Sequence, residues 1–363
     1  MTSTRVAVLG TGLVGTSVAM AAVRAGDDVT GWDEDARHAV RAAERAGFRA
    51  AASLQGAVQD AELVIVATPM ATLADVAVRA LAAAPAAVVT DAGSVKGVIL
   101  AEVARSAPPG DAGRFVGGHP MGGSERSGPE HASASVVDDI VWVLTPGSGT
   151  DPDAVDRLEA WVRSIGARPI RMDAARHDRL VAFVSHLPQV ASTSLMGLVA
   201  DEEAGEPEIL LLAAGGFRDL TRLAASNPGL WSEILLSNRD AVVQAVDLYV
   251  DRLTRLRDLI GAGGGEDVRA TFASAKAARL TLAAKPQVRS GVAVIQVPIP
   301  DRPGALAQLT AALGESRVNI EDLQIVHSPE GGRGTVHLTV AATAADVAST
   351  TLAVHDFDPT RLA

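Results

Sequence analysis

Short apolar runs alternate with longer alanine-rich stretches along the first 170 residues. The runs are rich in β-branched side chains and have few polar positions, which is typical of strands in a parallel sheet that is buried on both faces. The stretches between them, such as 15–25 and 72–83, have the character of helices. This alternation predicts βαβ units and a doubly wound α/β fold for residues 1–172. The predicted strands are "RVAVLG", "DVTGWD", "LVIVAT", "AAVVTD" and "IVWVLT".

The pattern changes twice after residue 172. From 173 to 285 the strand signal disappears, and long helical stretches predict an all-α domain with a kink at Pro188 in the first long helix. From 291 to 363 the runs "VAVIQVPI", "DLQIVHS" and "TVHLTV" alternate with two helical stretches. This order predicts a small α+β domain of the βαββαβ type, in which "VHDFDPTRLA" makes a poor final strand.

Composition excludes several classes of protein. Hydrophobic residues make up 48% of the 363 residues, so we do not expect a disordered chain. No apolar run is long enough to cross a membrane, and "MTSTRVAVLG" leaves no room for a signal peptide. The net charge of −11 disfavours a nucleic-acid partner, and the absence of cysteine excludes disulfides and thiolate metal sites. We therefore expect a cytoplasmic protein without membrane or nucleic-acid partners.

A glycine motif follows the first predicted strand. In "VAVLGTGLVGTSVA" the G-x-G-x-x-G spacing stands between a strand and a helix, where glycines allow a tight turn and a close approach to a pyrophosphate. Asp33 ends the second strand, where a carboxylate binds ribose hydroxyls and repels a 2′-phosphate. These features predict a Rossmann-type domain that binds NAD in preference to NADP. The expected cofactor contacts are Gly10, Gly12, Leu13, Val14, Gly15, Asp33, Thr68, Pro69 and Ser94.

Two later segments carry residues that could take part in catalysis, His119 and Ser94. The stretch "RFVGGHPMGGSERSG" (114–128) is interpreted as a loop, because glycine and proline disfavour helices and strands. With "DAGSVKG" it is expected to open on the carboxyl edge of the sheet, beside the nicotinamide. His119 could take a proton from a substrate hydroxyl, since the unperturbed pKa of histidine lies near neutrality. Ser94 could hold that imidazole in one tautomer while it contacts the cofactor.

Four motifs together resemble those of the prephenate/arogenate dehydrogenase family. They are "DAGSVKG", "GGHPMGGSERSG", "HDRLVAFVSHLPQ" and "GGFRDLTRLAASNPGLW", and they occur in the family's order and spacing. The resemblance extends from the first strand to about residue 285. It implies the oxidative decarboxylation of a cyclohexadienol by NAD without a metal, on a Rossmann domain followed by a helical domain that forms a homodimer.

The resemblance also implies roles for individual residues. His119 would act on the ring hydroxyl of the substrate, and Ser94 would orient it. Arg222 would bind a substrate carboxylate through a planar bidentate contact. Glu125 would line the pocket, and Arg218 stands where the family often has lysine or arginine.

The family's two substrates differ in the side chain, which carries a keto group in prephenate and an ammonium in arogenate. Gln189 stands in "SHLPQ" where prephenate-using members often have a second histidine. A neutral amide can accept a hydrogen bond from an ammonium, but it can equally donate one to prephenate. We take prephenate, converted to 4-hydroxyphenylpyruvate in tyrosine biosynthesis, as the expected substrate and arogenate as the alternative.

The C-terminal stretch "IPDRPGALAQLTAALGESRVNIEDLQIVHS" resembles an ACT domain, a module that often binds amino acids. The resemblance implies a ligand between a turn and a facing loop, and an aromatic amino acid is the expected effector. A dimerisation module without a ligand is the alternative. The implied ligand contacts are Asp301, Pro303, Gly304, Asn319 and Ile320.

Other ionisable residues leave alternatives open. His177 and Asp178 are expected to cap or link helices, and His186 fits either a core or a pocket position. A β-hydroxyacid dehydrogenase would rely on a catalytic lysine, for which Lys96 is the obvious candidate. A nucleotide- and amino-acid-sensing regulator would keep the glycine loop but would not need His119 with its partners.

Overall fold

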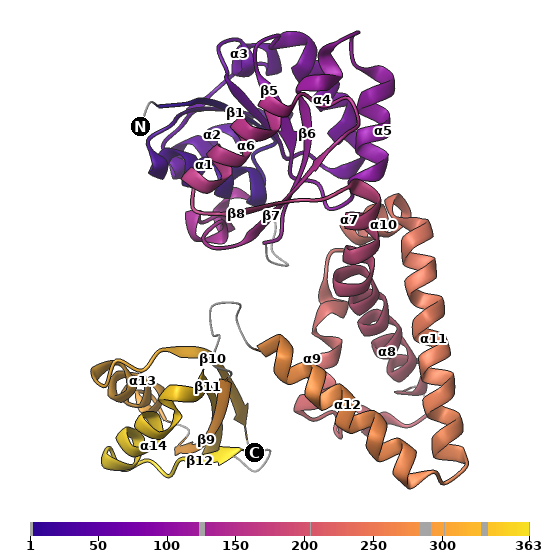
Figure 1. Ribbon diagram of the computed structural model, residues 1–363, viewed down its shortest axis with the longest axis vertical. Coiled ribbons are helices and arrows are strands. Elements are labelled where there is room, and N and C mark those ends of the chain that lie inside the picture. Colours follow the sequence, from indigo (N-terminus) through magenta and orange to yellow (C-terminus); the bar gives the residue numbers. More distant parts are fainter. Residues whose placement is uncertain are drawn as a thin grey trace. The chain divides into compact units, whose positions relative to one another are not determined.

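The computed structural model describes residues 3–122, 128–203, 205–283, 292–300, 302–327 and 333–362. Two compact units make up the chain. The first unit comprises Met1–Ser194 and Leu223–Leu248, and the second comprises Leu195–Arg222 and Tyr249–Ala363. Figure 1 shows their helices and strands. No helix in the described part of the chain is both long and apolar enough to cross a bilayer.

An eight-stranded sheet organises the described part of the first unit, in the order β3-β2-β1-β4-β5-β6-β7-β8. Neighbouring strands are parallel except at the β6–β7 pair, which is antiparallel. The order of the first six strands is that of a Rossmann fold, so the predicted doubly wound fold is confirmed. The strands are β1 (Arg5–Leu9), β2 (Asp28–Trp32), β3 (Arg49–Ala50), β4 (Leu63–Val66), β5 (Val88–Asp91), β6 (Phe115–Pro120), β7 (Val141–Pro146) and β8 (Arg168–Arg171).

Helices cover both faces of this sheet (Figure 1). In β1, Val6 and Val8 face one core, and Ala7 and Leu9 face the other, because side chains alternate along a strand. The first core takes side chains from α1, α2 and α6, and the second takes them from α3, α4 and α5. These helices are α1 (Leu13–Ala25), α2 (Ala36–Ala46), α3 (Leu54–Val58), α4 (Met70–Ala83), α5 (Gly97–Ser106) and α6 (Pro152–Ser164).

Strand β6 corrects one expectation, because the segment around His119 begins as a strand and not as a loop. Its glycines allow the neighbouring strands to come unusually close. A Cβ atom at Gly118 would overlap the carbonyl oxygen of Asp91, and one at Gly117 would overlap Oγ1 of Thr145. Composition alone therefore suggested a loop where close strand packing requires glycine. The short edge strands β3 and β8 were not predicted either.

A run of helices follows β8, and the first unit takes from it the residues up to Ser194 and those of Leu223–Leu248. Helix α7 (Ala174–Val181) leads through a π-helical turn, Ala182–His186, into α8 (Leu187–Glu203). This widened turn lies directly before Pro188, where the sequence predicted a kink. A proline clashes with the carbonyl four residues earlier, which here belongs to Val184 within the π turn. Later helices are α10 (Pro228–Ser237) and α11 (Arg239–Gly261), and Ile234 of α10 packs into the core around α4.

The second unit contains helices α9 (Gly215–Thr221) and α12 (Gly265–Ala283) and a four-stranded antiparallel sheet, β10-β11-β9-β12. The predicted βαββαβ order is confirmed. The expected weak final strand does form, but it has only three residues and pairs with β9 through Leu362 and Val294. The C-terminal elements are β9 (Val292–Pro300), α13 (Ala305–Glu315), β10 (Ile320–His327), β11 (Arg333–Ala341), α14 (Ala345–Val354) and β12 (Thr360–Leu362).

Candidate active site

The glycine loop between β1 and α1 has the geometry of a dinucleotide cradle. Gly10 has a φ of +92°, and a Cβ there would lie 2.6 Å from the carbonyl oxygen of Ala67. A Cβ at Gly15 would overlap the carbonyl oxygen of Gly10, so this glycine lets the helix pack closely on the loop. A Cβ at Gly12 would meet no atom within 4 Å, which leaves open space in front of the loop. The three glycines thus serve the turn, the helix packing and the approach of a ligand.

The first turn of α1 is also suited to a pyrophosphate. The N-cap Gly12 offers no side chain to the free amides of Leu13, Val14 and their neighbours, so these amides can bind an anion. Asp33 follows β2, and its carboxylate accepts hydrogen bonds from the backbone and the hydroxyl of Thr11, at 2.7 and 3.1 Å. The carboxylate is therefore fixed beside the loop, where a ribose would lie.

The loop after β4 contributes a second polar group. Thr68 follows this strand, and Pro69 is the N-cap of α4. The hydroxyl of Thr68 is buried and has no hydrogen-bond partner within the described segments. A buried polar atom without a partner is unfavourable, which makes Thr68 a suitable cofactor contact. These residues together fit a dinucleotide such as NAD.

His119 lies in β6 at the carboxyl edge of the sheet. Pairing of Thr90 with Val116 aligns β6 with β5, and His119 lies three residues farther along, beyond the end of β5 at Asp91. Ligands of open α/β sheets bind at this edge. Ser94 follows β5 in the next loop and is half-buried, and the described residues form no hydrogen bond between Ser94 and His119.

The ring of His119 belongs to a chain of three ionisable side chains. Its Nδ1 lies 2.8 Å from Nε2 of His177, and the Nδ1 of His177 lies 2.8 Å from Oδ1 of Asp178. His177 is 1% exposed. We expected Ser94 to hold the imidazole of His119, but His177 occupies its Nδ1 side. The contact between Ser94 and His119 stays a prediction.

Asp178 also performs the capping role that we expected. Its carboxylate accepts hydrogen bonds from the backbone amides of Lys96 and Gly97 at 2.8 and 2.7 Å, which ties α7 to the start of α5. Burial raises the pKa of this carboxyl, but the hydrogen bonds from His177, Lys96 and Gly97 outweigh burial and lower the pKa below its ordinary value. Asp178 is therefore a carboxylate at neutral pH.

The surroundings keep the ring of His119 neutral. Burial lowers the pKa of His119 well below its usual value, and the charge of Lys96 and the nearby His177 and His186 lower it further. A neutral imidazole can accept a proton through one nitrogen, as a general base must.

A buried ion pair supports the strand that carries His119. Lys96 and Asp91 are both fully buried and form an ion pair with each other. The Nζ of Lys96 also donates to the carbonyl of Gly118 at 2.6 Å, and Asp91 accepts from the amide of Gly118 at 2.9 Å. The ammonium group of Lys96 thus links β6 to β5. This arrangement explains the lysine structurally and leaves the catalytic role of the rival hypothesis without support.

His186 is a core histidine. Its side chain is 1% exposed, its Nδ1 lies 3.2 Å from Nδ2 of Asn238, and its ring packs edge-on against Trp231. Burial lowers the pKa of His186 to about 4 although Asp178 opposes that effect. Of the two interpretations that the sequence left open, these contacts favour the core position.

Gln189 uses its amide within the protein. Its Nε2 donates to the carbonyl of Leu223 at 2.8 Å, and its Oε1 accepts from Ser226 at 3.4 Å. The residue is 5% exposed. These bonds attach α8 to the residue that follows Arg222 in the chain. A contact between Gln189 and the substrate stays a prediction.

The predicted carboxylate-binding residues lie in exposed positions. Arg218 is in α9, and Arg222 begins the short 3-10 helix Arg222–Ala225. Both belong to the second unit, whereas His119 belongs to the first. Glu125 lies outside the described residues.

The predicted effector residues surround two short connections in the C-terminal domain. Gly304 has a φ of +89° and is the N-cap of α13, directly after Pro303. The side chain of Asn319 donates to Glu321 at 2.6 Å, just where Ile320 begins β10. Asp301 lies outside the described residues.

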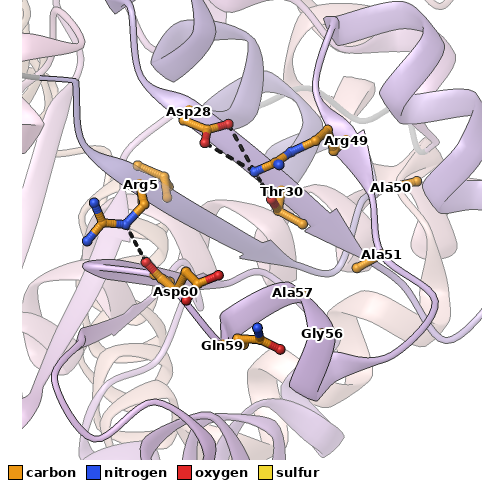
Figure 2. Close-up of a pocket in the computed structure, with 12 residues that line it drawn as sticks. Arg5, Asp28, Thr30, Arg49, Ala50, Ala51, Gly56, Ala57, Gln59 and Asp60 are labelled. Atoms are coloured by element: carbon orange, nitrogen blue, oxygen red, sulfur yellow. Dashed lines mark hydrogen bonds and ion pairs between the residues drawn. The ribbon is translucent and has the colours of Figure 1, made fainter.

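A pocket of about 260 Å³ lies beside the first residues of β1 and β2 (Figure 2). Arg5 and Asp28 begin β1 and β2 there, and Arg49 donates to both oxygens of Asp28 at 3.1 Å. Because these arginines already have oxygen partners, the pocket offers no free cation for an anionic ligand. No group of three or more potential metal ligands occurs among the described residues.

The histidine–aspartate chain is the part of the site that sequence reasoning missed. The adjacent His177 and Asp178 gave only a weak signal, because Arg176 and Arg179 flank them in the same helical stretch. Nothing in the sequence, however, showed that His177 meets His119, 58 residues earlier.

Three family models match the chain. The nucleotide-binding domain of prephenate dehydrogenase matches residues 18–171, its dimerization domain matches 173–274, and the ACT domain matches 293–356. The prephenate dehydrogenase of Bacillus subtilis (strain 168) is 31% identical over 340 residues, which cover 91% of this chain and 90% of that protein.

Solved structures are similar as well. The crystal structure of prephenate dehydrogenase from A. aeolicus in complex with hydroxyphenyl propionate and NAD+ has a TM-score of 0.72 at 26% identity, and the match covers 78% of this chain and 99% of that one. Synechocystis arogenate dehydrogenase has a TM-score of 0.67 at 28% identity, with 76% and 98% covered.

Proposed function

The chain belongs to the prephenate dehydrogenase family, and on that premise we propose that it converts prephenate to 4-hydroxyphenylpyruvate by NAD-dependent oxidative decarboxylation. It is an NAD-dependent dehydrogenase with a nucleotide-binding domain. The observation that supports the proposal most is the position of His119, a neutral imidazole at the sheet edge that also carries the glycine loop.

The chemistry assigns a task to each group. His119 accepts the proton of the ring hydroxyl as that oxygen becomes a phenol or carbonyl oxygen. When bound, NAD accepts the hydride from the same carbon, and the ring carboxylate leaves as carbon dioxide. The amides at the start of α1 bind the pyrophosphate, Asp33 binds the ribose, and Ser94 contacts the nicotinamide side.

Prephenate is the proposed substrate, and arogenate remains the second candidate because a solved relative is an arogenate dehydrogenase. The deciding experiment follows NADH absorbance with each compound in turn. A higher kcat/KM with prephenate supports the proposal, whereas a higher kcat/KM with arogenate replaces it by arogenate dehydrogenase. Turnover of neither compound would contradict both.

Asp33 is expected to make NAD the preferred cofactor. A 2′-phosphate next to its carboxylate adds a repulsion that is worth at least about tenfold in kcat/KM. Asp33→Asn keeps an oxygen for Thr11 but removes the charge, so the NAD/NADP ratio of kcat/KM should fall. Asp35→Asn, two residues away at the N-cap of α2, is the matched control and should change the ratio less. Equal use of both cofactors by the wild type would contradict the role of Asp33.

Arg222 is proposed to bind a substrate carboxylate. Arg222→Ala should raise the KM for prephenate by about 10–10² and leave the KM for NAD unchanged, because charge-assisted hydrogen bonds to the substrate are lost. Arg222→Lys should restore binding only in part, since the planar fork is missing. The control is Arg239→Ala, an exposed arginine that pairs with Asp240. If NAD binding weakens instead, Arg222 contacts the cofactor.

A homodimer built on the helical domain is proposed as the functional assembly. The match to a dimerization domain supports it, and so do large apolar side chains that are exposed in the second unit. These include Leu211, Leu212, Leu220, Ile260 and Phe272. The domain boundaries 1–172, 173–285 and 291–363 and a cytoplasmic location are part of the same proposal.

The C-terminal domain is proposed to bind an aromatic amino acid and to regulate the enzyme. A chain that ends at residue 285 should keep its kcat but lose inhibition by tyrosine or phenylalanine. The solved structure from A. aeolicus supports testing such a shortened chain. The match covers 99% of that structure but only 78% of the present chain, so that structure has no counterpart of the remaining part. Initial rates at increasing amino-acid concentration test the expectation. Unchanged inhibition in the shortened chain would show that the amino acid acts at the active site.

A further inference from the structure

The hydrogen bonds around Asp178 determine where the protons of the histidine pair lie. Oδ1 of Asp178 accepts from the amide of Lys96, and Oδ2 accepts from the amide of Gly97. An ionised carboxylate can only accept, so the Nδ1 of His177, 2.8 Å from Oδ1, must carry a proton.

The same reasoning extends to His119. A neutral imidazole with a protonated Nδ1 has a lone pair on Nε2, so Nε2 of His177 is an acceptor. Nδ1 of His119, 2.8 Å away, must then be the donor. The opposite arrangement would place the lone pair of His177 Nδ1 against the carboxylate, which is repulsive. His119 is left with an unprotonated Nε2.

We infer that Asp178 and His177 are positioning residues that fix the tautomer of His119, with the proton on Nδ1 and the basic lone pair on Nε2. This inference rests on the proposed role of His119 as the base. A serine hydroxyl is not needed to select the tautomer, and Ser94 can contact the cofactor or the substrate.

The chain of side chains also distributes the charge of the transferred proton. The substrate hydroxyl gives its proton to Nε2 of His119, and the Nδ1 proton of His119 can move to Nε2 of His177. The new positive charge then lies next to the carboxylate of Asp178. The histidine pair holds this proton until the phenol oxygen of the product takes it back, after the ring carboxylate has left as carbon dioxide.

Other charged groups oppose a permanently protonated chain. Lys96, at the start of α5, is buried and paired with Asp91, and its positive charge disfavours a cation on His119. The nearby His186 also lowers the pKa of His119, and its Nδ1 is hydrogen-bonded to Asn238. His119 is therefore neutral at rest, which suits a base that must accept a new proton in each turnover.

Two substitutions of His177 separate positioning from simple packing. His177→Gln supplies an amide oxygen that can accept from His119 and an amide nitrogen that can donate to Asp178, so the tautomer should persist. His177→Leu supplies neither, so kcat should fall by about 10–10² with little change in the KM for NAD. The control is Trp161→Phe, which removes a hydrogen bond from a buried side chain to Asp27 in another part of the first unit.

Nitrogen-15 NMR of histidine-labelled protein measures the tautomer directly. The resonances of His119 are identified by their loss in His119→Asn. We expect a protonated Nδ1 and an unprotonated Nε2 in the wild type and in His177→Gln, and a mixture of tautomers in His177→Leu. Circular dichroism checks that each variant is folded.

The outcomes are distinguishable. A proton on Nε2 of His119 in the wild type, or a folded His177→Leu with undiminished kcat, would overturn the inference while the function stands. An undiminished kcat in His119→Asn would instead overturn the proposed function, whatever the tautomer. The expected tautomers together with the loss in His177→Leu and its rescue in His177→Gln would establish the positioning role.

Discussion

Replacement of His119 by asparagine is expected to lower kcat by about 10²–10⁴, the usual contribution of a positioned acid–base group. The physical reason is that the amide has no lone pair basic enough to accept the proton of the ring hydroxyl. NAD binding should change little, because the proposed cofactor contacts lie in the glycine loop and after β2, β4 and β5. Steady-state kinetics with both substrates varied measure the effect. Loss of NAD affinity with an intact kcat would contradict the assignment.

The pH dependence of the wild type follows from the same residue. The proposed mechanism requires a neutral His119, whose pKa is lowered well below its usual value by burial and by the charge of Lys96. The acidic limb of the kcat profile should therefore lie below pH about 6.5, the ordinary pKa of histidine. The free energy of unfolding should also fall as the pH drops below about 6.5, because His119 in the folded state binds fewer protons there than in the unfolded chain. Unfolding must be measured at each pH to separate the two losses.

Replacement of Lys96 by methionine is expected to destabilise the protein by about 3–5 kcal/mol, because it leaves the carboxylate of Asp91 buried and unpaired. Urea unfolding monitored by circular dichroism measures this change. The matched control is Arg49→Met, which breaks the exposed pair with Asp28 and should cost less than about 1 kcal/mol.

A second substitution identifies the cause. Asp91→Asn in the Lys96→Met background removes the unpaired charge and should restore part of the lost stability. If Lys96→Met is instead as stable as the wild type but inactive, the lysine takes part in catalysis and the structural explanation is wrong.

The sequence predicted the architecture well because its signals are local. The short β-branched runs, the glycine spacing and the acid at the end of β2 each depend on neighbouring residues, and the sheet and the cradle follow from them. The segment around His119 was misjudged because Gly117 and Gly118 suggested a loop. Their actual role, close packing against β5 and β7, depends on strands that are distant in the sequence.

The sequence predicted individual residues of the candidate site but not the contacts between them. His119 and the glycine loop were selected correctly for the carboxyl edge of the sheet. The link between His119 and His177 was not, because it depends on how α7 packs against the strands. The use of Lys96 as a buried partner of Asp91 was missed for the same reason, since a lysine in a loop is normally exposed.

The π-helical turn at Ala182–His186 determines how the gene can vary in length. Each helical residue adds a rotation of about 100° and a rise of about 1.5 Å. A codon gained or lost in the α-helical parts between His177 and Gln189 would therefore turn one of them away from its partner, His119 or Leu223. Surface loops absorb insertions and deletions more readily than this helical interval does. Relatives that keep both contacts should keep the number of residues between them, and a length change here would mark a lineage that has given up one of the two.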